Sequence, residues 1–132
     1  MSELTRIPAP DGLAPAAQYS HVVLGTGTFV AISGQLALDE DGKLVGEGDP
    51  TAQARQVFEN LRLALAAAGA AFDDVVKLTY FVTDMEYMPA IRSARAEHIP
   101  DDRLPAASAV QVAALVQPEF LMEVEAFAVV GQ

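Results

Sequence analysis

Residues 50–82 read PTAQARQVFENLRLALAAAGAAFDDVVKLTYFV, and this stretch decides the fold. Its first half carries apolar residues at spacings of three and four, which gives a helix one apolar face. These residues are Ala54, Val57, Phe58, Leu61, Leu65 and Ala68. Asp49 can cap the helix, Pro50 suits its first position, and Gly69 suits the left-handed conformation that closes the last turn. We therefore predict a helix from Pro50 to Ala68.

The second half of the stretch predicts a strand. Residues Val75 to Val82 are rich in β-branched and aromatic side chains, which is typical of a central strand buried on both sides. A second helix is expected next, because Asp84 can cap its start and apolar residues recur from Met88 onward. Pro89 fits only the first turn of that helix, and Pro100 marks its end.

Short β-prone segments lie on both sides of this central part. Tyr19–Leu24 and Thr28–Ile32 are separated by a Gly-Thr-Gly turn, which predicts a hairpin. The longer segments Ala107–Val116 and Leu121–Val130 predict a second hairpin near the C-terminus. Strands and helices do not alternate strictly along the chain, so we predict an α+β fold with two helices packed on one face of a mixed sheet.

The length and the composition narrow the function. The 132 residues suit one domain, with residues 1–17, rich in Pro and Ala, as an N-terminal arm. The net charge of −10, with only eight Lys and Arg, argues against a nucleic-acid partner, which needs clustered cations. Cysteine is absent, and neither a signal peptide nor a membrane-spanning stretch is visible, so we expect a cytoplasmic protein with no membrane partner. The two histidines, His21 and His98, are too few for a metal site, and we expect no metal.

Five short motifs are SGQ at 33–35, ARQ at 54–56, VTD at 82–84, LPAASAVQV at 104–112 and EVEAFAV at 123–129. Together they make the chain similar to the RidA (YjgF) family of small proteins that hydrolyse reactive enamines and imines. The resemblance implies a chorismate-mutase-like fold and a barrel-like homotrimer with small-molecule clefts between its subunits. It implies no cofactor.

Glu123 is the candidate catalytic residue. Strand side chains alternate with a period of two, so Glu123 and Glu125 share one face of the last strand. From the residues alone this face is either a solvated surface or the border of a cleft. The resemblance places Glu123 in the cleft, where its carboxylate would orient a water or move a proton, and leaves Glu125 a structural role.

The resemblance also assigns substrate-binding residues. Tyr19 stands where the family has a cleft tyrosine, and Ser33 and Gly34 stand where the main chain contacts the ligand. Gly34 also predicts a bulge or a close approach to the backbone. Three further cleft positions lie on the strand after Pro105: Ala107, Ser108 and Ala109.

Residue 107 is where this chain departs from the family pattern. Deaminase members have an arginine there that grips the substrate carboxylate, and alanine cannot replace a guanidinium fork. Arg92 is the candidate substitute for this cation, and Arg103 is the alternative. We therefore expect hydrolysis of an enamine, an imine or a related reactive metabolite, with Glu123 handling the water. The alternative is a trimer that binds a metabolite without turning it over.

Overall fold

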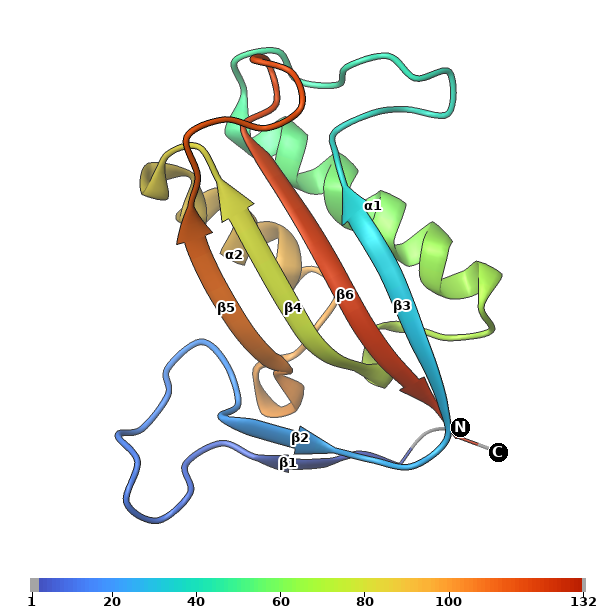
Figure 1. Cartoon of the computed structure of the whole chain (residues 1–132), viewed down its shortest axis with the longest axis vertical. Coiled ribbons are helices and arrows are strands. Elements are labelled where there is room, and N and C mark those ends of the chain that lie inside the picture. Colours follow the sequence, from blue (N-terminus) through green and yellow to red (C-terminus); the bar gives the residue numbers. More distant parts are fainter. Residues whose placement is uncertain (1–2, 132) are drawn as a thin grey trace.

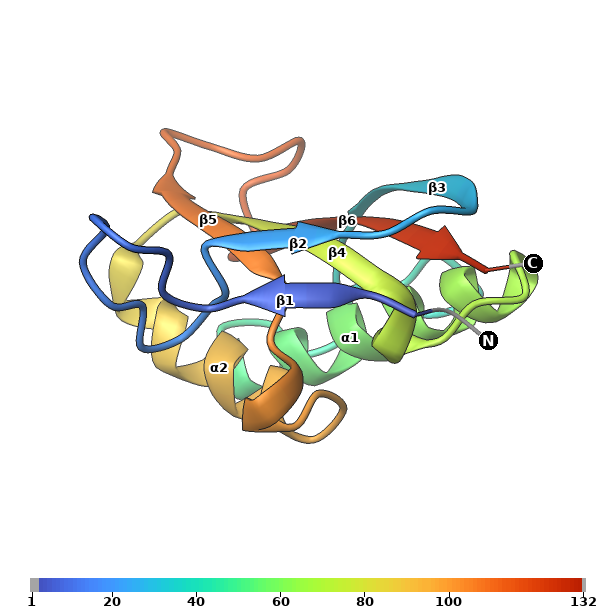
Figure 2. The ribbon, with the colours of Figure 1, turned by 90° about the horizontal axis from the view of Figure 1, so that it is seen from below.

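The protein is described by a computed structural model that covers residues 3–131. A mixed sheet of four strands has the order β3-β6-β4-β5, and Figure 2 shows both helices on one side of it. The strands of this sheet are β3 (Thr28–Gln35), β4 (Val75–Val82), β5 (Ala106–Gln111) and β6 (Met122–Val130). The helices are α1 (Pro50–Ala67) and α2 (Met88–Ala96), and a separate ribbon of two strands consists of β1 (Thr5–Ile7) and β2 (Val22–Leu24). The predicted α+β class and the packing of two helices on one sheet face are confirmed.

Helix α1 follows its sequence signals closely. The side chain of Asp49 accepts a hydrogen bond from the backbone N–H of Ala52 at 3.1 Å, and Pro50 occupies the first turn. Gly69 has a φ of +72°, the left-handed conformation expected just after the helix end. The apolar face of α1, with Phe58 and Leu61 fully buried, packs on the sheet. The predicted helix is therefore confirmed to within one residue.

Strand β4 lies in the middle of the sheet, between β6 and β5, as predicted. Its residues Leu78, Tyr80 and Val82 are buried under the helices, whereas Thr79 and Phe81 on the other face are half-buried. We call this second surface, which no helix covers, the open face of the sheet. Burial on both sides, as predicted for β4, is thus incomplete in a single copy of the chain.

The predicted C-terminal hairpin is wrong. Strand β5 pairs in parallel with β4, and β6 lies antiparallel between β3 and β4. A parallel pair needs a crossover connection, and α2 supplies it on the way from β4 to β5. Strand β5 ends at Gln111, so only the first five of the ten residues predicted as a strand, Ala107–Val116, belong to it. Figure 1 shows β5 at one edge of the sheet and β6 inside it.

The N-terminal hairpin is also wrong, because β2 pairs with β1 and not with β3. Strand β3 pairs with β6 instead, starting at Thr28 opposite Val130. Gly27, at a φ of +145°, lies so close to the main chain of Val130 that a side chain would not fit. The predicted arm is therefore not wholly irregular: it contains β1, followed by a loop that covers residues 8–21 and that we call the N-terminal loop.

Candidate functional site

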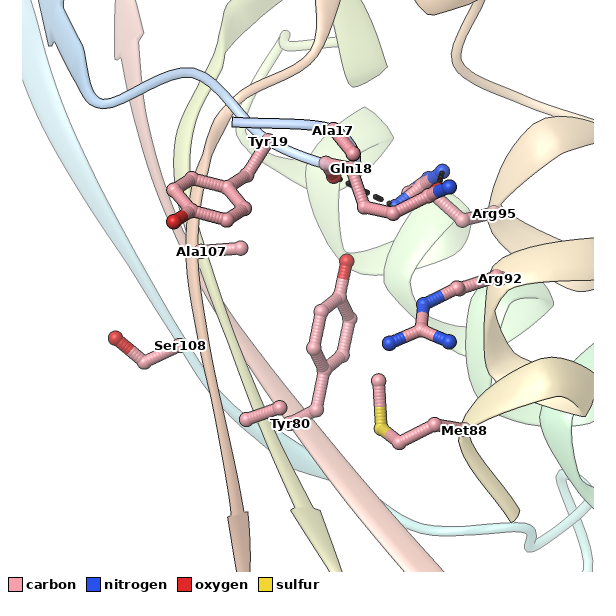
Figure 3. A pocket seen from close by; sticks show the side chains of 10 residues that line it. Ala17, Gln18, Tyr19, Tyr80, Met88, Arg92, Arg95, Ala107 and Ser108 are labelled. Carbon is pink, nitrogen blue, oxygen red and sulfur yellow. Dashed lines mark hydrogen bonds between the residues drawn. The ribbon is translucent and has the colours of Figure 1, made fainter. Parts of the chain in front are cut away.

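A cavity of about 220 Å³ lies at the β5 edge of the sheet, on the helix side. Its walls come from the N-terminal loop, β4, α2 and β5, and Figure 3 shows their side chains converging. The lining residues are Ala17, Gln18, Tyr19, Tyr80, Met88, Arg92, Arg95, Ala107, Ser108 and Ala109. Five residues predicted to bind substrate are among them: Tyr19, Arg92, Ala107, Ser108 and Ala109.

The N-terminal loop forms one wall of the cavity because Arg95 holds it. The Arg95 guanidinium donates to the main-chain oxygen of Gln18 at 3.0 Å and to its side-chain Oε1 at 2.9 Å. Arg95 is only 3% exposed, so these charge-assisted bonds lie away from water. Ser20 adds a hydrogen bond from its hydroxyl to the oxygen of Leu104 at 2.7 Å. The loop is thereby tied to both α2 and the segment before β5.

Tyr19 projects from this tied loop over the β5 edge (Figure 3). Its ring packs edge-on against His21, with centroids 5.3 Å apart and planes at 70°. The Nε2 atom of His21 lies 2.7 Å from the main-chain oxygen of Ala14. His21 thus supports the Tyr19 ring from behind and is not itself part of the cavity lining.

Small side chains make the space for the cavity. Ala107 pairs with Leu78 and Ala109 pairs with Tyr80, so both alanines belong to the helix-facing side of the sheet. An alanine at 107 leaves empty the volume that a long side chain would fill from β5. Met88 and Arg92 reach toward that space from α2, and the Tyr80 ring crosses it from β4 (Figure 3).

The electrostatics of the cavity are positive. Arg92 and Arg95 both line it, and its lining contains neither Asp nor Glu. Burial raises the pKa of Tyr80, while the charges of Arg95 and Arg92 counteract part of that rise. The Tyr80 phenol is therefore neutral at physiological pH and offers an O–H donor next to two guanidinium groups.

Glu123, Ser33 and Gly34 form a second group on the open face. Ile32 pairs with Ala126 and Gln35 with Val124, so Ser33 and Gly34 together oppose Glu125 alone, which is a β-bulge. A β-carbon on Gly34 would overlap the Glu123 carboxylate and would lie 2.7 Å from its Cγ and Cδ. The glycine therefore leaves the space that the Glu123 side chain occupies. The predicted bulge and close approach at Gly34 are both present.

The two groups do not meet within one chain. Glu123 pairs with Phe81 on the open face of β6, and β4 separates it from the cavity at β5. Arg103, the alternative cation, is in neither group: its guanidinium donates to Asp73 at 2.7 Å.

The sequence reasoning missed Tyr80 and Arg95. Tyr80 alternates with Leu78 and Val82 along β4, and Arg95 follows Arg92 by one helical turn, but neither pattern by itself indicates a pocket.

No three His, Asp or Glu side chains among residues 3–131 lie close enough together to hold a metal ion. In the same part of the chain, neither helix has the length and the apolar character that crossing a membrane requires.

The fold and the cavity define a class of protein: an α+β subunit with an open sheet face and a small-molecule-sized pocket at the sheet edge. The family described as Endoribonuclease L-PSP matches residues 9–130. The RutC family protein slr0709 of Synechocystis sp. is 35% identical over 117 residues, covering 88% of each chain. The RutC family protein PH0854 of Pyrococcus horikoshii is 34% identical over 120 residues, covering 91% of this chain and 90% of the relative.

Solved structures agree with these relatives. YyfB of Yersinia pestis, a Rid family protein of unknown function, is 34% identical with a TM-score of 0.83, covering 95% of this chain and 98% of its own. RidA from the Antarctic bacterium Psychrobacter sp. PAMC 21119 is 36% identical with a TM-score of 0.72, covering 95% of this chain and 94% of its own. The chain therefore belongs to the Rid (YjgF) family, as its motifs predicted, and is a RidA-like protein.

Proposed function

We propose that this protein is a homotrimer that hydrolyses an enamine, an imine or a related reactive metabolite in clefts between its subunits. In each cleft, Glu123 of one copy faces the cavity of a neighbouring copy and orients the attacking water. Tyr19, Arg92, Ala107, Ser108 and Ala109 line the ligand's side of the cleft, and the main chain at Ser33 and Gly34 borders it beside Glu123.

The observation that carries the proposal is the fit between Gly34 and Glu123. A carboxylate next to apolar side chains is costly unless it is solvated or paired. Here Glu123 lies opposite Phe81, shares its face of β6 with Glu125 and Phe127, and is half-buried beside a glycine that has no side chain to compete for its space. A residue serving only as a solvated surface charge needs no such room.

The open face supports assembly. Phe29 on β3 is 63% exposed and packs against Phe127 at a centroid distance of 5.5 Å, and Val110 on β5 is 42% exposed. Apolar side chains gathered on a sheet face that no helix covers are typical of a surface buried against another copy. Such burial would also shield Glu123 from bulk water.

The chemistry follows from these placements. Glu123 accepts a proton from water as the water oxygen attacks the carbon of a protonated C=N bond, which gives a neutral carbinolamine. Glu123 then returns this proton to the nitrogen, the C–N bond breaks to release ammonia, and the carbinolamine hydroxyl loses its own proton to leave a carbonyl compound. General acid–base catalysis of this kind contributes roughly 10²- to 10⁴-fold in rate.

The net charge of −10 makes RNA an unsuitable substrate despite the name of the matching family. We propose that the protein acts in the cytoplasm without a cofactor.

The second candidate function is binding without turnover. It is favoured by Ala107, because β5 offers no cation to fix a substrate carboxylate in front of Glu123. A trimer with the same clefts would then hold a metabolite and release it unchanged.

The test compares imine decay with and without excess protein. We expect freshly generated 2-iminopropanoate, or a neutral ketimine of similar size, to disappear faster with wild-type protein. Glu123→Gln should abolish the acceleration, whereas Glu125→Gln, the same change two residues away on the same face, should retain it. If neither imine decays faster with wild-type protein, the hydrolytic function is wrong and the binding function is favoured.

A further inference from the structure

We infer that the cavity takes a ligand with one carboxylate, and that Arg92 of α2 holds this carboxylate together with the Tyr80 hydroxyl. This inference rests on the proposed function, because it names the substrate class of the same cleft. The cation that binds the carboxylate would then come from α2, and not from residue 107 on β5.

The charge of the cavity is the first argument. The chain has 18 Asp and Glu against eight Lys and Arg, so a surface chosen without regard to charge would be acidic. The cavity instead contains two arginines and no acidic side chain. A pocket with this positive charge attracts an anion and repels a cation.

Arg92 is the arginine available to that anion. Within residues 3–131, the other five arginines each donate to a protein oxygen: Arg6, Arg55, Arg62, Arg95 and Arg103. Arg92 has no such partner in the described part of the chain, and Figure 3 shows its guanidinium turned into the pocket beside Tyr80 and Met88. Its donors are thus free to bind both oxygens of a planar anion.

Tyr80 complements Arg92. Tyr80 is 3% exposed and extends from β4 toward the two arginines of α2, with its hydroxyl directed into the cavity (Figure 3). A neutral phenol and a guanidinium present donors, and an ionised carboxylate presents only acceptors. The two groups therefore suit a carboxylate better than an amide or an ammonium group.

The other residues that line the cavity determine which groups the rest of the ligand can carry. Met88, Ala107 and Ala109 are apolar and line the space next to the proposed anchor. Arg95 keeps its positive charge, but its terminal N–H groups already donate to the neutral Gln18, so Arg92 is the lining arginine whose guanidinium fork can bind a carboxylate. The ligand is therefore a small monocarboxylate with an apolar body, held so that its reacting group points out toward the cleft.

Calorimetric titration with phenylacetate and with phenylacetamide, which has nearly the same shape but no charge, tests the inference on the full-length protein. We expect wild-type protein to bind phenylacetate at least about tenfold more tightly than the amide, as expected for a hydrogen bond to a charged group. Arg92→Gln should remove this preference, Arg92→Lys should keep part of it, and Tyr80→Phe should weaken phenylacetate about threefold. Arg62→Gln on α1, an exposed arginine paired with Glu59, is the matched control and should change nothing.

Three results would overturn the inference: equal affinity of the wild type for the two probes, no binding of phenylacetate, or an unchanged affinity in Arg92→Gln. If Arg92 instead pairs with Glu123 of a neighbouring copy, Arg92→Gln will weaken the oligomer and leave phenylacetate affinity unchanged. If phenylacetate binds tightly through Arg92 but imines are not hydrolysed, only the catalytic function is refuted. If imines are hydrolysed and Arg92→Gln does not change the rate, only the role of Arg92 as the carboxylate anchor is refuted.

Discussion

The two faces of the sheet hold polar groups in opposite ways. On the helix side, Arg92, Tyr80 and Tyr19 line a cavity together with a loop that Arg95 holds in place. On the open face, Glu123 sits half-buried beside Gly34. The cavity therefore has the shape of a binding site but no Asp or Glu in its lining, whereas the open face carries a half-buried carboxylate. In the proposed trimer, the cavity of one copy and the Glu123 carboxylate of its neighbour form one site.

The largest effect is expected from filling the space at Gly34. The backbone there has no positive φ, so Gly34→Ala fits the strand, but the new methyl group must displace the Glu123 carboxylate. The flexible end of a side chain moves easily, so stability should hardly change. Imine hydrolysis should fall roughly 10²- to 10⁴-fold, as for loss of a general base. Normal activity in a folded Gly34→Ala protein would show that the position of Glu123 is unimportant.

The next effect concerns the open face. Phe29→Glu places a charge on a surface that the proposal buries between copies, and a buried unpaired charge costs several kcal/mol. We expect light scattering to show smaller species at micromolar concentration, with activity lost in parallel. Leu63→Glu is the matched control, because Leu63 is 52% exposed on α1, on the opposite side of the molecule. An unchanged mass for Phe29→Glu would remove the open face from the interface.

A moderate effect is expected at the loop that closes the cavity. Arg95→Gln removes two charge-assisted hydrogen bonds to Gln18. A hydrogen bond to a charged group contributes about 1.5–3 kcal/mol to stability. Urea denaturation should show a free energy of unfolding lower by about 2 kcal/mol, and KM should rise because Tyr19 loses its fixed position. Arg55→Gln breaks an exposed ion pair with Glu97 and should cost less than about 1 kcal/mol. Equal losses in the two variants would contradict a special role for Arg95.

The smallest effect is a pH dependence. Burial raises the pKa of Tyr80 in the folded protein above its ordinary value, so the folded state resists ionisation of this phenol. The resulting stability is fully present below pH about 10 and is lost as the pH rises through the folded pKa. Tyr80→Phe lacks this group, and we expect its melting temperature to fall less steeply above pH about 10 than that of the wild type. Parallel curves would mean that Tyr80 ionises freely.

The sequence predicted the parts of the fold that depend on local pattern. Helix α1 carries its own periodicity and both caps, and β4 is bounded by turns, so neither needs a partner to be recognised. Strand pairing is different, because alternation says which residues share a face but not which strand lies alongside. The segments that became β5 and β6 were adjacent in sequence and similar in pattern, yet β6 inserted between β3 and β4.

The site shows the same division. The resemblance to the family supplied Tyr19, Ala107 and Glu123, and the helix position supplied Arg92. Tyr80 could not be assigned, because its side of β4 is defined only once α2 and β5 are in place. Arg95 reads as a solvated helix residue until the N-terminal loop folds over it.

Mixing two inactive variants tests most directly whether the two faces complete one site. We expect the Glu123→Gln and Arg92→Gln proteins each to be inactive alone. In the experiment, equal amounts of the two variants are mixed, unfolded and refolded together. If each site takes Glu123 from one copy and Arg92 from its neighbour, about a quarter of the sites in randomly mixed rings regain both residues, and activity returns to that level. If both residues act within one chain, no mixed assembly contains an intact site, and the mixture will stay inactive.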